Sequence, residues 1–170
     1  MKKKKLYDQR GITLVEIIIV IAIIGIFASS AVMMLGHLHY ANTQKVVKTL
    51  DAALDQLQVQ TLSKTGKYYM YVYKLSDGYY MRILPDNLSS FDESKLTSDG
   101  TKLCNNTIRL WGIQAGTPTE IKEKDYYVKV SYTKTALFNS SDTNIDEIEI
   151  DGVPKYNLKL VMDTGKHFIN

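Results

Sequence analysis

Cysteine is almost absent from this sequence, which has one in 170 residues, Cys104. One cysteine cannot form an internal disulfide, so the fold does not depend on oxidation. A lone thiol is more often a small buried apolar residue than a nucleophile, and no residue pattern around Cys104 argues for catalysis. We therefore expect Cys104 to have a structural role.

Catalytic and cofactor-binding motifs are also missing. The sequence contains no Gly-rich phosphate loop, no His-Glu-x-x-His, no Cys-x-x-Cys and no nucleophile elbow. Nothing argues for an enzyme, and we predict neither a cofactor nor a catalytic residue.

Positive charge is scarce outside the first residues. The formal net charge of the chain is +3. Residues 1–11 contribute +4 of it, from Lys2 to Lys5 and Arg10 against Asp8, which leaves −1 for residues 12–170. A chain that lost this segment would have no bulk positive charge with which to attract nucleic acid.

Charged residues are nearly absent from residues 12–35, which read ITLVEIIIVIAIIGIFASSAVMML. These 24 residues carry one ionisable group, Glu16. A helix of this length spans about 36 Å, enough to cross a hydrocarbon core of roughly 30 Å. Since the preceding lysines should hold the N-terminal end in the cytoplasm, we expect a single-pass membrane segment with the rest of the chain outside.

Glu16 bears on what this segment does. A carboxylate in a membrane helix costs ~3 kcal/mol on insertion scales, so it generally has a purpose and a partner. A plain membrane anchor does not need it, and the apolar core of a secretory signal peptide, cut here near residues 28–31, would be weakened by it. The apolar run is also longer than the roughly 7–15 residues of such a core. Both interpretations leave Glu16 unexplained.

The start of the apolar run resembles a known processing signal. A lysine-rich leader ends in Arg10-Gly11 and is followed by Ile-Thr-Leu-Val-Glu and the long apolar run. Residues 10–32 resemble the class III signal of type IV pilins and pseudopilins. The resemblance implies that a prepilin peptidase cuts after Gly11 on the cytoplasmic face of the membrane and N-methylates the new first residue, Ile12.

The resemblance also implies which residues act in filament assembly. Glu16 matches the glutamate at the fifth mature position of the family, and Gly25 matches a glycine that recurs in the family's helix. Cleavage creates a positive amine at Ile12, and in a filament Glu16 of one subunit could neutralise the amine of its neighbour, because each charge alone is costly in an apolar core. The alternative is that Glu16 faces lipid headgroups near the start of the helix.

Two positions depart from the family pattern. Phe is commoner than Ile at the position of Ile12. Main pilins often carry proline where this chain has Met33, and without proline the helix has no fixed kink there. Because some minor pilins and pseudopilins also lack this proline, Met33 favours a minor subunit.

The helix is expected to continue beyond the apolar run. Val46, Leu50, Ala53 and Leu57 recur at spacings of three and four and define one apolar face. Gly66 follows as a stop signal. Residues 36–65 are therefore predicted to form an amphipathic continuation of the helix.

After Gly66 the apolar pattern takes a period of two, which indicates strands. Strands are predicted at residues 67–74, 79–84, 106–113, 126–133, 145–150, 156–162 and 166–169, with a loop at 85–102 and turns at Asp77-Gly78, Asp151-Gly152 and Thr164-Gly165. We expect an antiparallel sheet of five to seven strands packed on the second half of the helix.

The predicted fold class is therefore α+β, with a long N-terminal helix packed on a C-terminal antiparallel β-sheet, as in the pilin fold that the resemblance implies. The predicted parts are a leader peptide (1–11), a transmembrane or filament-core helix (12–35), the amphipathic helix (36–65) and an antiparallel β head domain (66–170).

Tyrosine is abundant on the predicted strands, and two explanations are open. Aromatic residues form strands well and pack across a sheet, so we interpret them chiefly as core. An exposed tyrosine patch would instead bind a partner subunit, a glycan or nucleic-acid bases. The tyrosines concerned are Tyr68, Tyr69, Tyr71, Tyr73, Tyr79, Tyr80, Tyr126, Tyr127 and Tyr132.

Metal sites are weakly supported. The acidic segment Asp142–Asp151 has clustered oxygen ligands of the kind that calcium prefers, but its spacing is not that of an EF-hand. Alternate residues of this segment, from Glu147 onward, share one strand face, so a solvated face explains them better. His37 and His39 point in different directions on a helix and His167 is isolated, so no metal site is predicted.

The sequence thus predicts a structural subunit of a type IV pilus or pseudopilus, with prepilin peptidase, the membrane and other pilin subunits as partners. It would be held in the cell membrane before assembly and in an extracellular filament afterwards. A DNA-capturing or adhesive competence-type subunit and a membrane-anchored domain that never assembles remain as alternatives. The helix signature does not distinguish a pilus from a secretion pseudopilus or a competence pilus, nor a tip from a shaft position.

Overall fold

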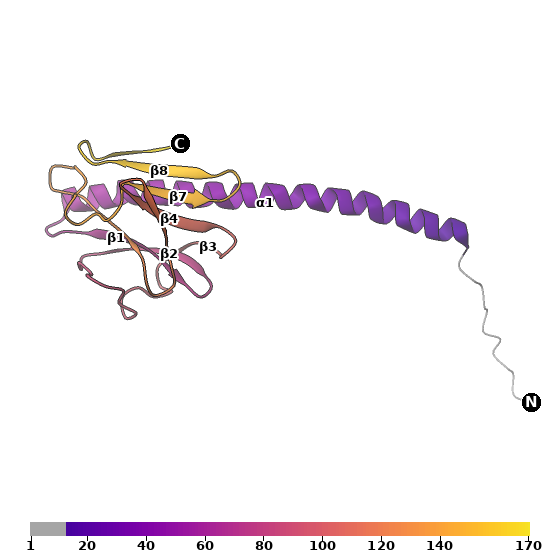
Figure 1. The fold of residues 1–170 in the computed structure, drawn as a ribbon, viewed down its shortest axis with the longest axis horizontal. Coiled ribbons are helices and arrows are strands. Elements are labelled where there is room, and N and C mark those ends of the chain that lie inside the picture. Colours follow the sequence, from indigo (N-terminus) through magenta and orange to yellow (C-terminus); the bar gives the residue numbers. More distant parts are fainter. Residues whose placement is uncertain (1–12) are drawn as a thin grey trace, which may run out of the picture. The chain divides into compact units, whose positions relative to one another are not determined.

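A computed structural model of the chain describes residues 13–170, apart from the side chains of residues 30–33 and 35. In this part of the chain one helix, α1 (Leu14–Ser63), is followed by nine strands (Figure 1). The residues form two compact units, Met1–Leu38 and His39–Asn170, so α1 contributes to both. The second unit, which we call the head domain, contains all of the strands.

The strands form two sheets in which every neighbouring pair is antiparallel. Sheet A has the order β3 (Thr101–Cys104), β2 (Gly78–Leu84), β1 (Tyr69–Leu75), β6 (Val128–Ser131). Sheet B has the order β5 (Thr117–Glu120), β4 (Arg109–Gln114), β7 (Glu147–Asp151), β8 (Tyr156–Val161), β9 (Lys166–Ile169).

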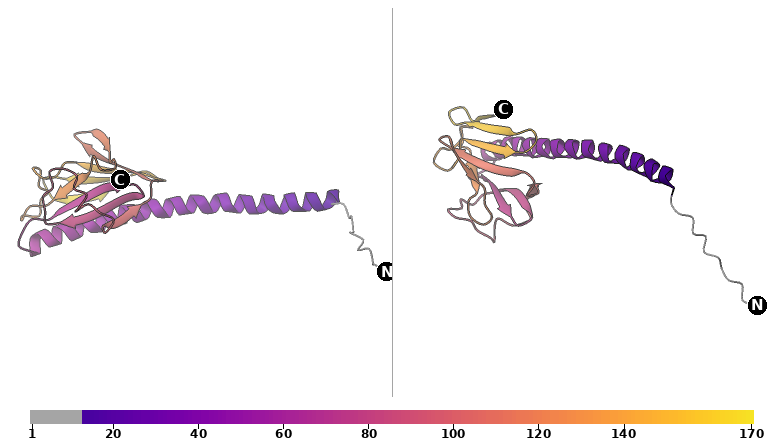
Figure 2. Two further views of the ribbon diagram at one scale, coloured as in Figure 1. Left: turned by 90° about the horizontal axis from the view of Figure 1, so that it is seen from below. Right: turned by 45° about the vertical axis from the view of Figure 1, so that its right-hand side comes forward.

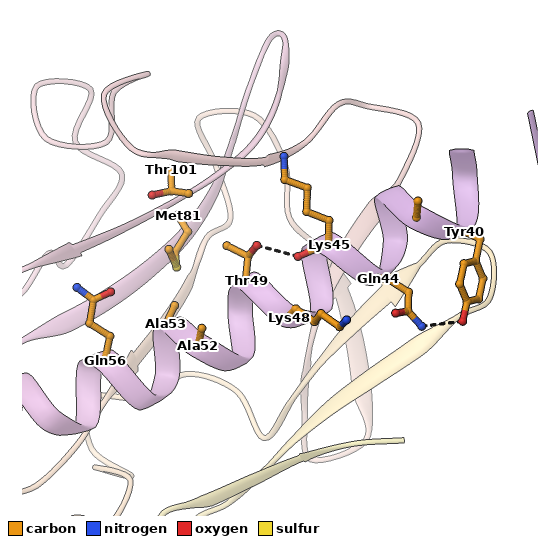
Figure 3. A pocket seen from close by; sticks show the side chains of 11 residues that line it. Tyr40, Gln44, Lys45, Lys48, Thr49, Ala52, Ala53, Gln56, Met81 and Thr101 are labelled. Carbon is orange, nitrogen blue, oxygen red and sulfur yellow. Dashed lines mark hydrogen bonds between the residues drawn. The ribbon is translucent and has the colours of Figure 1, made fainter. Parts of the chain in front are cut away.

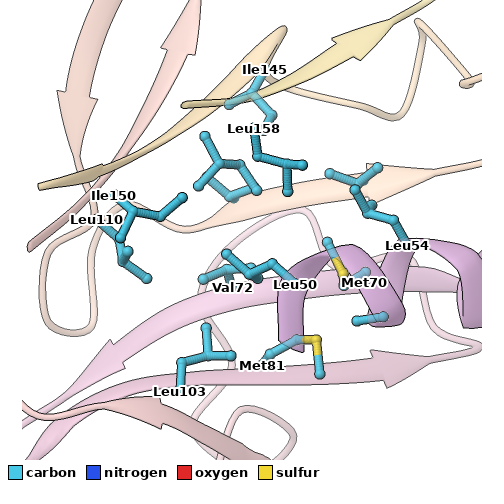
Figure 4. Close-up of a cluster of buried hydrophobic side chains, with 14 of the residues drawn as sticks. Leu50, Leu54, Met70, Val72, Met81, Leu103, Leu110, Ile145, Ile150 and Leu158 are labelled. Carbon is cyan, nitrogen blue, oxygen red and sulfur yellow. The ribbon is translucent and has the colours of Figure 1, made fainter. Parts of the chain in front are cut away.

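The apolar face of α1 lies at the centre of the main core of the head domain (Figure 4). All four residues predicted to define this face, Val46, Leu50, Ala53 and Leu57, are buried. They belong to one cluster with side chains from both sheets, among them Met70, Val72, Met81, Leu110, Ile150 and Leu158. Figure 2 shows the sheets on one side of this part of α1. The predicted α+β class, with a helix packed on antiparallel strands, is confirmed.

The prediction of a single sheet with five to seven strands was wrong. Strands β3 and β5 were missed, and the start of β3 lies within the predicted loop 85–102. Both strands are four residues long and lie at sheet edges, where β3 buries one side chain and β5 buries none, so they show no apolar alternation. A sheet edge also tolerates Pro118, which a central strand would not.

Most tyrosines of sheet A form a second core rather than a surface. Tyr69, Tyr71 and Tyr73 alternate with the buried Met70 and Val72, so the strand β1 buries both of its faces. Residues 85–100 cover the tyrosine face through Leu88 and Leu96. Of the nine tyrosines named above, six are buried and three are half-buried. The core interpretation is confirmed, and no exposed tyrosine patch forms among these residues.

Hydroxyl groups tie the covering segment to the sheet. The Tyr71 hydroxyl donates to the Asp86 carbonyl and accepts from the Leu88 amide, both at 2.8 Å. The Tyr73 hydroxyl donates to the Thr97 carbonyl at 2.5 Å. Burial raises the pKa of both Tyr71 and Tyr73 to about 12, so these phenols stay protonated donors across the physiological range.

The C-terminal end of α1 is capped from a distant loop. The last turn of α1 contains no basic residue, yet its unpaired carbonyls carry partial negative charge. The Lys134 ammonium group donates to the Thr61 carbonyl and to the Lys64 carbonyl, the latter at 2.5 Å. The Gln58 amide also donates to the Ala136 carbonyl at 3.2 Å, so the loop after β6 is fixed to this helix end.

Within residues 13–170, no helix is long and apolar enough to cross a membrane. The transmembrane character expected of residues 12–35 therefore stays a prediction.

Replacing Lys134 by Met should lower the free energy of unfolding of the head domain by about 1 kcal/mol, because two helix-end carbonyls lose a charged donor. Chemical denaturation of the full-length protein in detergent measures this change. Lys122→Met removes an equally exposed lysine and is the control. Equal stability of the two variants would contradict the capping role.

Candidate processing and assembly site

The predicted processing residues lie just before the described part of the chain. Gly11 and Ile12 fall outside residues 13–170, so nothing in the structure tests the predicted cut between them. Glu16 and Gly25, the predicted assembly residues, both lie on α1. The site is therefore described from Thr13 onward.

Thr13 and Glu16 cap the start of α1 reciprocally. The Glu16 carboxylate accepts from the Thr13 amide at 3.1 Å and from the Thr13 hydroxyl at 3.2 Å. In return the Glu16 amide donates to the Thr13 hydroxyl oxygen at 3.2 Å. This is a capping box, in which a threonine and a glutamate three residues later satisfy amides that have no partner in the helix.

The capping box gives Glu16 a role that the sequence reading missed. The signal was available, because a Thr or Ser followed three residues later by Glu, just before an apolar run, marks a helix start. A carboxylate in the first turn also interacts favourably with the helix dipole. The predicted partner of Glu16, the Ile12 amine of a neighbouring subunit, requires a second chain and stays a prediction.

The surface of α1 from Leu14 to Phe27 is apolar on every side apart from the exposed Glu16. The exposed side chains are Leu14, Val15, Ile17, Ile18, Ile19, Val20, Ile21, Ile23, Ile24, Ile26 and Phe27. Consecutive residues on a helix point in all directions around its axis, so they leave no polar face to meet water. A helix of this kind needs an apolar environment from lipid or from other protein.

Gly25 has no packing role within the described chain. A Cβ atom built at Gly25 would meet nothing within 4 Å. Its carbonyl accepts from the Ser29 hydroxyl at 2.8 Å, an interaction that does not require glycine. Its predicted part in assembly therefore stays a prediction, and any close approach would come from a partner.

The acidic residues between Asp142 and Asp151 are held by protein donors in separate places. The Asp142 carboxylate accepts from the Asn139 amide group at 2.6 Å and the Asn87 amide group at 3.2 Å. Asp146 accepts from the Ala115 backbone amide at 2.6 Å. Across residues 13–170, no group of three or more His, Cys, Asp or Glu side chains is arranged to hold a metal ion.

The expectation that His167 is isolated was wrong. His167 is only 11% exposed, and its Nε2 atom lies 3.2 Å from an Asp51 oxygen and 3.7 Å from an Asp55 oxygen on α1. More than a hundred residues separate these partners in the sequence, so no local pattern could have shown the contact. It joins the last strand, β9, to the helix.

Cys104 behaves as expected of a structural thiol. It is free and half-buried. Burial raises its pKa to about 11, so the reactive thiolate form is scarce at neutral pH. Nothing around Cys104 supports a catalytic role.

An open groove of about 800 Å³ runs along α1 within the head domain (Figure 3). Its floor is α1 between Tyr40 and Gln56, and its wall is Met81 of β2 and Thr101 of β3. It brings together no titratable pair, nucleophile or metal ligands that would support catalysis.

Replacing Thr13 by Ala should make the first turn of α1 unfold locally more often, because the Glu16 amide loses its hydrogen-bond acceptor. We expect this turn to lose about 1 kcal/mol of stability, which corresponds to roughly fivefold faster amide hydrogen exchange. Hydrogen exchange followed by NMR in detergent micelles measures it. Thr13→Ser keeps the hydroxyl and should exchange like the unmodified chain, whereas equal exchange in Thr13→Ala would disprove the cap.

Comparison with known proteins adds a match to the N-terminal segment. The family model described as the prokaryotic N-terminal methylation motif matches residues 6–32. No curated protein and no solved structure matches the chain. The match covers the second half of the predicted leader, the capping box and the exposed apolar part of α1. The chain therefore carries, over residues 6–32, the N-terminal methylation signal that type IV pilins and pseudopilins share.

Proposed function

We propose that the chain is a structural subunit of a type IV pilus or pseudopilus, cut after Gly11 and assembled through its N-terminal helix. The observation that carries the proposal is the apolar surface of α1 from Leu14 to Phe27, which lies within the matched residues 6–32 and carries a single charge, Glu16. A surface of this kind fits lipid before assembly and the helices of neighbouring subunits afterwards.

Storage in the cell membrane is part of the proposal. The 24 residues from Ile12 to Leu35 contain one ionisable group, and the lysines of the leader precede them. This arrangement favours a cytoplasmic N-terminus and an external head domain. Extraction from the membrane into a filament would exchange lipid contacts for protein contacts along the same helix surface.

Glu16 would serve two purposes, one before assembly and one in the filament. In the single chain its carboxylate closes the capping box with Thr13. In the filament its negative charge would neutralise the amine that cleavage creates at Ile12 of a neighbour, because neither charge is tolerated alone in an apolar core. A minor rather than a main subunit is favoured by Met33, which stands where main pilins often carry proline.

The direct test is to determine the N-terminal residue of the protein, and its mass, in cells with and without the prepilin peptidase. We expect a chain that starts at Ile12 and carries one added methyl group, and only when the peptidase is present. Mass spectrometry of the membrane fraction gives both facts. A chain that starts at Met1 in both strains would mean a plain membrane anchor, and a start near Ala31 would mean an ordinary secreted domain.

Glu16→Gln separates the two roles of this residue. Glutamine also serves in a capping box, so the helix start should persist, but the charge is gone. We expect normal cleavage and at least about a tenfold loss of filaments in the sheared surface fraction, since an unpaired buried amine costs several kcal/mol. Thr13→Ser is the matched control. Normal filament yield from Glu16→Gln would contradict the charge pairing.

A further inference from the structure

One end of the head domain combines aromatic, apolar and cationic groups around the beginning of its helical part. The turn between β7 and β8 is seated on α1 there, because the Val153 amide donates to the Thr43 hydroxyl at 3.2 Å. Any Cβ atom at Gly152 would collide with the Thr43 side chain, so the turn lies as close to the helix as a backbone can. The turn is therefore held firmly in place.

Tyr40 is fixed at the same end. The Gln44 amide nitrogen donates to the Tyr40 hydroxyl at 2.8 Å and to the Tyr156 hydroxyl at 3.1 Å. This pair of bonds links α1 to the first residue of β8, just after the turn. Arg109 and Val153 also line one small hollow with Thr43. We call Tyr40, Lys45, Arg109 and residues 153–155 the collar.

The tip of the collar is apolar and faces outward. Val153 is 62% exposed and Tyr40 is 47% exposed, and Pro154 between the valine and Lys155 is exposed as well. Exposed apolar groups on a rigid turn, beside a tyrosine, match the residues that proteins place at the membrane–water interface.

The most exposed charged groups of the collar are cations. Lys155 pairs with Glu149 at 2.8 Å, but the lysine is 54% exposed and the glutamate 17%. Arg109 pairs with Asp151 at 3.1 Å, with exposures of 58% and 37%. Lys45 is exposed and forms no ion pair with any carboxylate of residues 13–170. In each pair the cation is the more exposed partner.

We propose that the collar rests on the lipid headgroup layer of the membrane that stores the subunit, with its cations on lipid phosphates and Val153 and Tyr40 among the headgroups. The proposal rests on membrane storage through residues 12–35, as put forward above. Tyr40 follows Leu35 by five residues, which span at most about 18 Å even when fully extended. The chain itself therefore keeps the collar within reach of the interface. Anionic lipids would strengthen the contact.

The test uses the full-length precursor in phosphatidylcholine vesicles with and without phosphatidylglycerol. In a Cys104→Ala background, single cysteines carry an environment-sensitive fluorophore, and a nitroxide on the lipid headgroup quenches it. Val153→Cys reports on the collar. Leu62→Cys is the matched control, since Leu62 is also apolar and 49% exposed but lies on α1 about 28 Å beyond Thr43. Val20→Cys, read with an acyl-chain nitroxide, reports on membrane insertion.

We expect the probe at position 153 to be quenched several-fold more than the probe at position 62, and more strongly in anionic vesicles. In the inserted protein, Lys155→Gln should lower the ratio of head domains whose collar contacts the headgroups to head domains without that contact about fivefold. Lys166→Gln, which removes an exposed lysine at the start of β9, should leave that ratio unchanged.

Four results would overturn the proposal. Equal quenching at positions 153 and 62 would mean that no particular end meets the membrane. If the probe at position 153 became better protected from quenching as the protein-to-lipid ratio rises, a second copy of the chain would be covering the collar. No quenching at position 153 with strong quenching at position 20 would leave the membrane segment standing and remove the headgroup contact alone. No quenching at position 20 would remove membrane storage, and the collar contact with it.

Discussion

The head domain depends on one face of α1. Leu50 and Leu57 bring side chains from both sheets into a single cluster, and each sheet alone would leave its inner face open to water. The sheets are in close contact at Gly112 of β4, where an added Cβ would collide with Tyr126 and with Val128 of β6. The shared face of α1 and the contact at Gly112 thus help to fix the packing of the two sheets against each other.

The same helix carries a second kind of surface in its earlier residues. From Leu14 to Phe27 its exposed side chains are apolar all round except for Glu16, whereas in the head domain it is apolar on one side only. The two patterns ask for different surroundings, since the first suits lipid or other helices and the second suits a folded domain beside water. The capping box between Thr13 and Glu16 fixes where the apolar part begins.

Much of this arrangement could be predicted from local pattern. The apolar face through Val46 and Leu57 and the strand β9 at residues 166–169 follow from residue spacing and turn residues, because burial imposes a period on the sequence. Edge strands such as β5 escaped prediction, since an edge needs no buried side. Lys134 at the end of α1 and His167 beside Asp51 could not have been found, because long-range contacts leave no trace in local spacing.

The contact between His167 and α1 has a consequence for the order of folding. β9 is the last element of the chain and forms one edge of sheet B, and His167 meets Asp51 across 116 residues. During synthesis Asp51 and Asp55 are made more than a hundred residues before His167, so this contact forms late. The edge of sheet B that β9 forms can therefore be completed only after strands β1 to β8 have been synthesised.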